Sequence, residues 1–298
     1  MSWWSLGLDL PEDRLACWRL SVALASRHYK VHLVTDSPGA SRLEKLPFAS
    51  VSLALDKLNL RYRKMWALGK IEAIREALAF ERPFLHIDGD VFLWQPLPES
   101  LMRSGIVAES PEPLIFYDWS YPIDYFWKNL GHVPADFRKG SSAYNCGIMG
   151  GCDLNFWKRY VDQVRELIFH PCNKTFWTSE HPVGIATTAE QYMLGAVADS
   201  NARNVTTLLG DRLSHDGRNY QHLATMKKNP GVMGSVIQRV SGHPYDLEYR
   251  PHLVPEEEIK SRSELCFSCD RRMSSDCGMS GTAIESIVRH GACWLEKW

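Results

Sequence analysis

Apolar positions in the first hundred residues alternate between helical spacing and short buried runs. The segments 18–29 and 63–80 place apolar residues three or four positions apart, which predicts two helices. The segments 30–36 and 83–87 are short apolar runs that end at turn residues, which predicts two strands. Since helices separate the strands, the pattern predicts an α/β fold on a parallel sheet, with ligands gathering at the carboxyl ends of its strands.

The middle of the chain continues this alternation. Residues 144–149 predict a strand, Gly150 and Gly151 predict a tight turn after it, and residues 187–198 predict a further helix. Asp153 is suited to cap a helix whose apolar residues share one face. These residues are Trp157, Tyr160, Val161, Val164 and Ile168. Beyond residue 200 the periodicity fades into loops.

Composition narrows the class of protein. The 298 residues carry a formal net charge of -1 with 23% charged residues. The chain therefore lacks the overall excess of positive charge that nucleic-acid binders use to attract phosphates. No apolar run approaches the ~20 residues of a membrane span, and the N-terminus lacks the pattern of a secretory signal. We therefore expect a cytoplasmic protein with no integral membrane segment and no nucleic-acid partner, whose eight cysteines are reduced thiols.

Two aspartates, Asp88 and Asp90, follow the strand at 83–87 with one glycine between them. Alternation along an extended chain would place both carboxylates on the same side, where they suit Mg²⁺ or Mn²⁺ shared with substrate phosphates. A simple Asp-Gly turn is the alternative. A calcium loop is excluded because the following positions are apolar. The aspartyl-phosphatase pattern is excluded because Phe92 stands where that pattern needs Thr or Val.

Several segments, taken in order, resemble one protein family. FLHIDGDVFLWQPL, from residue 84, resembles the D-x-D strand of glycosyltransferases with the GT-A fold, especially capsular-polysaccharide-synthesis-type and glycogenin-like enzymes. SWWS, HLVTD, YNCGIMGG and AEQYMLGA resemble the other landmarks of that family. The resemblance covers about residues 1–230 and implies a Rossmann-like α/β fold, with a mixed sheet flanked by helices. We expect a catalytic domain at 1–249 and a cysteine-containing C-terminal extension at 250–298.

The resemblance implies a nucleotide-sugar donor, most often a UDP-sugar, whose diphosphate is held by Mn²⁺ or Mg²⁺. Asp90 would be the principal metal ligand, Asp88 would hold the metal or the ribose, and Lys70 would steady the donor. The other donor-binding residues implied by the resemblance are Trp4, Ser5, Thr35, Asp36, Asn145 and Gly147. A solvated helix face is the alternative for Lys70, and ordinary packing is the alternative for the others.

Glu190 and Gln191 are the candidate catalytic residues. Some retaining members of the family carry a carboxylate and an amide at these positions, near the reactive face of the donor sugar. A second interpretation is open, because Thr187 and Glu190 also have the spacing of a capping box. His86 lies two residues before Asp88, so in an extended strand its side chain would lie on the same side as the aspartates. We interpret it as a packed core histidine. Carboxylates that could instead serve an inverting reaction are Asp118, Asp211 and Asp216.

His222 is the predicted third metal ligand. In the family, a later histidine closes the cation site beside a lysine that meets the diphosphate, and NYQHLATMKKNP offers His222 followed by Lys227 and Lys228. Neutral imidazole is a suitable ligand for Mn²⁺ beside carboxylates. A solvated loop histidine is the alternative.

The sequence thus predicts a metal-dependent glycosyltransferase that moves a sugar from a nucleotide-sugar to an unknown acceptor, with retention favoured over inversion. A nucleotide-sugar-forming nucleotidyltransferase is one alternative, although the start of the chain lacks a glycine-rich phosphate loop. A non-catalytic metal- or nucleic-acid-binding protein that uses the C-terminal cysteines is the other. For those cysteines we expect reduced thiols without zinc. They are Cys266, Cys269, Cys277 and Cys293.

Overall fold

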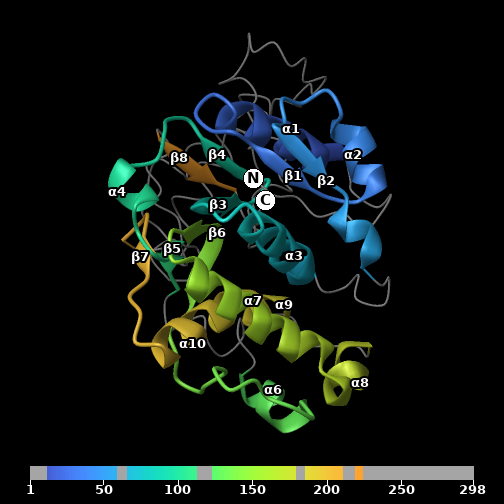
Figure 1. Ribbon diagram of the computed structural model, residues 1–298, viewed down its shortest axis with the longest axis vertical. Coiled ribbons are helices and arrows are strands. Elements are labelled where there is room, and N and C mark those ends of the chain that lie inside the picture. The colour runs from blue at the N-terminus through green and yellow to red at the C-terminus, as the bar shows by residue number, and fades with distance from the viewer. Residues whose placement is uncertain (1–11, 59–65, 113–122, 179–184, 211–218, 224–298) are drawn as a thin grey trace, which may run out of the picture.

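The structure is a computed structural model that describes residues 12–58, 66–112, 123–178, 185–210 and 219–223 (Figure 1). Its helices are α1 (Glu12–Ala25), α2 (Ser37–Leu43), α3 (Trp66–Leu78), α4 (Glu99–Met102), α6 (Ile123–Asn129), α7 (Leu154–Phe169), α8 (Lys174–Thr178), α9 (Ile185–Thr187) and α10 (Met193–Ser200). Its strands are β1 (His32–Val34), β2 (Ser50–Ser52), β3 (Phe84–Ile87), β4 (Val91–Leu93), β5 (Val107–Pro111), β6 (Tyr144–Gly151), β7 (Thr206–Thr207) and β8 (Tyr220–His222). Short helical turns are η1 (Ala54–Lys57), η4 (Pro171–Asn173) and the π-helical η5 (Thr188–Tyr192).

A four-stranded sheet in the order β3-β6-β5-β7 forms the centre of the fold. β6 is antiparallel to both β3 and β5, whereas β5 and β7 are parallel. In two smaller pairs, β1 is parallel to β2 and β4 is antiparallel to β8. The parallel sheet predicted from the alternation of elements is therefore wrong, because β6 runs against both of its neighbours. A mixed sheet flanked by helices is what the structure contains.

Gly150 and Gly151 continue β6 instead of forming the predicted turn. They pair with Leu85 and Phe84 of β3. Both have positive φ angles, 151° and 136°, which residues with a side chain rarely adopt. A Cβ on Gly150 would also lie 2.2 Å from the carbonyl oxygen of Phe84. Glycine is needed at position 150 because the backbones of β3 and β6 approach each other closely. At position 151 it is needed because a Cβ would lie 2.2 Å from the Gly105 carbonyl oxygen.

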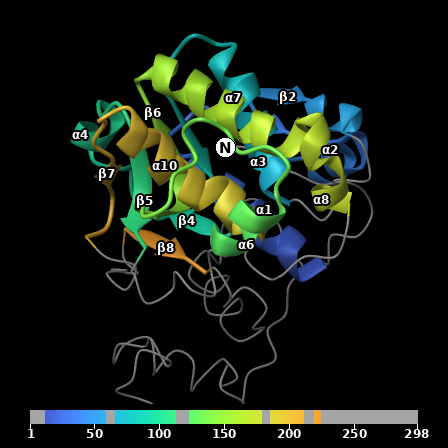
Figure 2. The same cartoon turned by 90° about the horizontal axis from the view of Figure 1, so that it is seen from below.

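The hydrophobic core occupies both faces of β6. Cys146 and Met149 pack with α3, α7 and α10, whereas Ile148 belongs to a second cluster with α1 and β4. Figures 1 and 2 show α3, α7 and α10 gathered beside β6. The predicted apolar face of α7 is confirmed, since each of its five residues is buried. The predicted cap is confirmed as well, because Asp153 Oδ1 accepts a hydrogen bond from the Phe156 N–H at 3.0 Å.

The two predicted N-terminal helices are observed with shifted ends. The helix predicted within 63–80 is α3, whereas the one predicted at 18–29 begins earlier and ends at Ala25. After Ala25 the backbone tightens, since the His28 N–H donates to the Ala25 carbonyl at 3.1 Å. Within the described ranges, no helix combines the length and the apolar character that crossing a bilayer requires.

Candidate metal centre

Asp88 and Asp90 flank a tight turn between β3 and β4. The Val91 N–H donates to the Asp88 carbonyl at 3.1 Å, so the chain bends here as Asp-Gly turns do. The predicted alternation along a strand is therefore wrong, although the two carboxylates still converge. A Cβ on Gly89 would lie 2.1 Å from the indole of Trp18. Glycine is needed at this position because the turn passes directly against that ring.

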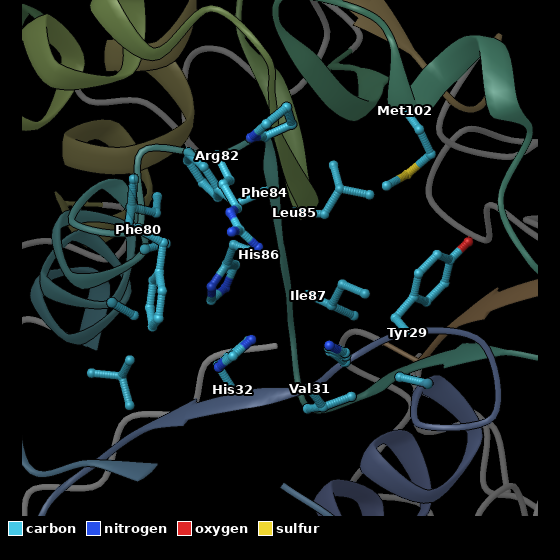
Figure 3. Close-up of a pocket in the computed structure, with 17 residues that line it drawn as sticks. Tyr29, Val31, His32, Phe80, Arg82, Phe84, Leu85, His86, Ile87 and Met102 are labelled. Carbon is cyan, nitrogen blue, oxygen red and sulfur yellow. The ribbon is translucent and has the colours of Figure 1, made fainter. Parts of the chain in front are cut away.

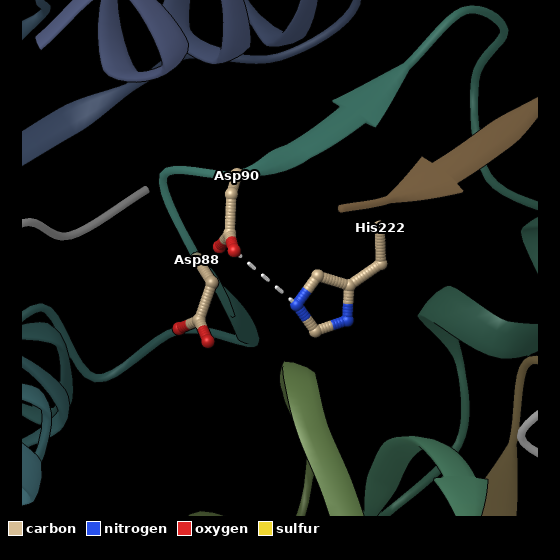
Figure 4. A group of neighbouring side chains, drawn as sticks. All are labelled: Asp88, Asp90 and His222. Carbon is tan, nitrogen blue, oxygen red and sulfur yellow. Dashed lines mark ion pairs between the residues drawn. The ribbon is translucent and has the colours of Figure 1, made fainter. Parts of the chain in front are cut away.

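His222 reaches the turn from the other end of the described chain. β8 pairs with β4 so that His222 lies opposite Val91, and the Leu223 N–H donates to the Asp90 carbonyl at 3.0 Å. The ring nitrogen Nε2 of His222 then lies 3.7 Å from Asp90 Oδ2 (Figure 4). One ligand atom from each of Asp88, Asp90 and His222 lies within 4.8 Å of the other two. The structure confirms that these three predicted ligands come together.

The three side chains differ in exposure. The Asp88 side chain is 26% exposed, whereas the side chains of Asp90 and His222 are 7% and 8% exposed. A ligand would therefore approach the cluster from the Asp88 side. Burial lowers the pKa of His222, but the carboxylates of Glu109 and Asp90 outweigh burial and raise this pKa to about 9. In the absence of a metal ion the His222 ring is therefore positively charged at pH 7. A bound cation would displace one of the two ring protons.

Two buried side chains hold Asp88. Lys70 Nζ lies 2.8 Å from Asp88 Oδ1, and His86 Nε2 donates to the same oxygen at 2.9 Å, since an ionised carboxylate only accepts hydrogen bonds. Burial raises the pKa of Asp88, but Lys70 and His86 outweigh burial and hold this pKa well below its usual range. Burial also lowers the pKa of His86 to about 4, so its ring is neutral at pH 7. His86 is thus more than the packed core residue that we predicted, because it positions Asp88.

Lys70 points from α3 into the protein. Its side chain is 3% exposed, and its ammonium group donates to the Cys146 carbonyl at 3.0 Å, in addition to Asp88 and Glu190. Burial lowers the pKa of Lys70, but Asp88 and Glu190 outweigh burial and raise it, so Lys70 is charged. The solvated-face alternative is therefore wrong. Lys70 joins the candidate metal centre to Glu190.

Glu190 is fully buried on η5, where its Oε1 accepts the hydrogen bond from Lys70. The capping-box alternative is wrong, because Thr187 has helical backbone angles and its side chain caps no N–H group. Burial raises the pKa of Glu190 to about 7, against the effect of Lys70. Gln191 lies beside Glu190 on η5 and is partly exposed. A catalytic role for either residue stays a prediction.

Glu109 is a residue of the candidate site that the sequence interpretation missed. It lies on β5, is 1% exposed, and its Oε2 accepts a hydrogen bond from His222 Nδ1 at 2.7 Å. The available signal was an acidic residue inside the strand segment VAESP, since a glutamate is almost never fully buried without a partner. Its partner could not be identified from this segment.

Asn145 and Gly147 lie on β6 beside the centre. Asn145 Oδ1 accepts a hydrogen bond from the Gly147 N–H at 3.0 Å, so the amide is engaged locally. A Cβ on Gly147 would lie 2.1 Å from Glu109 Oε2 and 2.7 Å from His222 Nδ1. Gly147 therefore makes room for this pair. Contacts of Asn145 and Gly147 with a ligand stay predictions.

Thr35 and Asp36 follow β1 and have local roles. The backbone of Thr35 bonds to Ser52 and Leu55, and Asp36 Oδ1 accepts from the Gly39 N–H at 2.9 Å, which caps α2. Donor contacts of Thr35 and Asp36 stay predictions. Further predicted residues lie outside the described residues, as does the domain boundary after 249. They are Trp4, Ser5, Asp118, Asp211, Asp216, Lys227, Lys228, Cys266, Cys269, Cys277 and Cys293.

A cavity of about 560 Å³ lies between the facing edges of β1 and β3, which are not paired with each other among the described strands (Figure 3). Its walls are mostly apolar, with Val31, Phe84 and Ile87 among them, and His86 contributes one side. Among the residues that the structure describes, no carboxylate lines the cavity. Mg²⁺ and Mn²⁺ favour carboxylate oxygens as ligands, so the carboxylate cluster and not this cavity is the candidate metal centre.

The donor set of the cluster fits a divalent cation. Two carboxylates offset the charge of Mn²⁺ or Mg²⁺, and the imidazole adds a third ligand. Three protein ligands leave coordination positions for water or substrate oxygens, as catalytic sites do. The donor set is therefore compatible with a metal ion that keeps open coordination positions, and binding of such an ion stays a prediction.

Part of the chain matches the model of a protein family whose function is unknown. No curated protein matches the chain. Residues 4–236 match the family, DUF6734, and this segment contains every described residue of the candidate centre. Because the match spans most of the chain, the protein belongs to the family of unknown function DUF6734.

Proposed function

We propose that this protein is a metal-dependent glycosyltransferase that uses a nucleotide-sugar donor. The observation that carries the proposal is the convergence of Asp88, Asp90 and His222 from two distant segments. The cluster combines the D-x-D pair with the later histidine in the arrangement that the resemblance to GT-A enzymes implies. A GT-A identity for the mixed α/β fold belongs to the same proposal.

A bound cation supplies Lewis-acid stabilisation of the negative charge that develops on a departing diphosphate. Asp90 and His222 are the least exposed of the three ligands and would hold the ion. Asp88 is already engaged by Lys70 and His86, so it would contribute a rigidly placed oxygen at the exposed side of the centre. This division of roles supports Asp90 as the principal ligand.

The Lys70–Glu190 pair extends the centre towards η5, where Gln191 is partly exposed. Since the side chain of Glu190 is fully buried, a role of Glu190 through Lys70 and Asp88 has more support than direct contact with the donor sugar. Gln191 is then the better candidate for such a contact. Retention of anomeric configuration remains the favoured outcome within this proposal.

The test is a panel of nucleoside-diphosphate sugars incubated with the full chain, with and without Mn²⁺, and analysed for release of nucleoside diphosphate. A glycosyltransferase should hydrolyse its own donor slowly and only with the metal. A nucleotidyltransferase would instead release pyrophosphate when given a nucleoside triphosphate and a sugar phosphate. A non-catalytic metal-binding protein would release neither product, and that result would overturn the proposal.

A further inference from the structure

We propose that Glu109 is the positioning residue of the candidate metal centre, because its carboxylate holds the His222 ring with Nε2 directed at Asp90. The inference rests on the proposed function in one respect, since it takes the cluster to be a cation site. Glu109 is not itself one of the three predicted ligands, and its Oε2 is paired with His222 Nδ1.

The hydrogen bond defines which ring nitrogen is available to a metal ion. A carboxylate only accepts hydrogen bonds, so the hydrogen between Glu109 Oε2 and His222 Nδ1 belongs to the ring. Metal-ligating histidines commonly donate the nitrogen that does not bind metal to a carboxylate, which sets ring orientation and strengthens the other nitrogen as a ligand. Nε2 is the nitrogen on the Asp90 side, 3.7 Å from Oδ2.

The backbone around Glu109 directs its side chain towards the centre. The register between β5 and β6 shifts between Ala108 and Ser110, so Glu109 lies at an irregularity of the bulge type. Such irregularities re-aim a side chain and are frequent beside functional sites. On β6, Gly147 leaves the space that the carboxylate and the ring occupy. The irregularity of β5 and the glycine of β6 thus both accommodate the hydrogen bond between Glu109 and His222.

The hydrogen bond between Glu109 and His222 is buried. Glu109 is 1% exposed and the His222 side chain is 8% exposed, so bulk water has little access to either partner. A carboxylate in this position is costly to bury unless it is paired. The ring is therefore held in one orientation before any ion arrives.

The experiment measures Mn²⁺ affinity by electron paramagnetic resonance in the full chain without donor. The variants are Glu109→Leu, which removes the acceptor, and Glu109→Gln, which keeps an acceptor oxygen at the same place. Glu72→Leu is the matched control, because Glu72 is an equally buried carboxylate whose partners are Arg75 and Arg165. We expect Glu109→Leu to weaken Mn²⁺ binding at least tenfold, and Glu109→Gln and Glu72→Leu to stay within threefold of wild type.

Wild-type affinity in Glu109→Leu would overturn the inference, and so would an equal loss in Glu109→Gln. If Glu109→Leu fails to fold, Glu109→Asp withdraws the carboxylate by one methylene group and should show the same tenfold loss, and wild-type affinity there would overturn the inference too. Failure of the wild-type chain to bind Mn²⁺ would instead contradict the proposed metal site itself. The two failures are therefore distinguishable.

Discussion

The candidate metal centre and the Lys70–Glu190 pair meet at Asp88 but balance their charges in different ways. At the centre, Asp88 and Asp90 gather on a partly exposed turn, and the ring of His222 is hydrogen-bonded to a third carboxylate, that of Glu109. In the pair, one ammonium group meets one carboxylate where both are almost fully buried. The gathered carboxylates suit a cation from outside, whereas the buried carboxylate of Glu190 already has a cation of the protein beside it, Lys70, which also contacts Asp88. The predictions below test this contrast.

The largest effect is expected from Lys70→Met. Glu190 would lose its partner while fully buried, and breaking a buried ion pair on one side costs about 3–5 kcal/mol. Urea unfolding should show this loss in the free energy of unfolding, and Lys70→Met combined with Glu190→Leu should recover much of it. Lys139→Met is the control, because its partner Asp124 is exposed and such pairs contribute about 0–1 kcal/mol. Equal losses in the two single variants would contradict the contrast.

Asp90→Asn should affect binding and leave the fold intact. Removing the principal ligand should weaken Mn²⁺ affinity by about 100-fold and leave less than about a tenth of the activity, since a metal ligand stabilises the transition state by several kcal/mol. The midpoint of unfolding without metal should change little, because the relief of repulsion from Asp88 and the lost attraction to protonated His222 act in opposite directions. Isothermal titration with Mn²⁺ measures the first effect, with the exposed Asp56→Asn as control. Retained activity above that level would show that Asp90 is not the ligand.

Gly147→Ala should disturb the centre by crowding. The added Cβ would press on Glu109 Oε2 and on the His222 ring, so we expect a loss of about 1–3 kcal/mol in stability and about tenfold weaker Mn²⁺ binding. Gly210→Ala is the matched control, since a Cβ there meets no atom within 4 Å. Thermal melts recorded with and without Mn²⁺ separate the two effects. A Gly147→Ala variant that is as strongly stabilised by Mn²⁺ as the wild type would argue against the placement of the pair.

The smallest effect is expected from His86→Phe, which keeps a ring and removes the donor to Asp88. Loss of this buried hydrogen bond should cost about 1–2 kcal/mol and weaken Mn²⁺ binding a few-fold, because Asp88 keeps its contact with Lys70. His32→Phe is the control, because His32 lines the same cavity but bonds to Ser50. Identical Mn²⁺ affinities of the two variants would show that His86 does not act on the centre.

The elements whose structure depends on residues nearby in the sequence were predicted correctly. The apolar spacing of α3 and α7 and the cap at Asp153 are local properties, and the structure confirms them. Predictions failed where the conformation or burial of a residue depends on contact with a distant segment of the chain. Gly150 and Gly151 are typical turn residues, yet they lie in β6, where only glycine allows the close approach of β3 to Gly150 and of Gly105 to Gly151. Burial likewise decided against a solvated Lys70, which a helical pattern alone does not reveal.

The sequence by itself determined that two carboxylates follow a buried strand, and the order of motifs singled out His222 as their partner. Only the tertiary structure decided how they meet, because the pairing of β4 with β8 joins segments that are far apart in the chain. It also brought in Glu109 and His86, whose roles depend on which side chains burial leaves them to contact. Spacing along a chain specifies faces and caps, but contacts between distant strands depend on backbone pairing that no local pattern encodes.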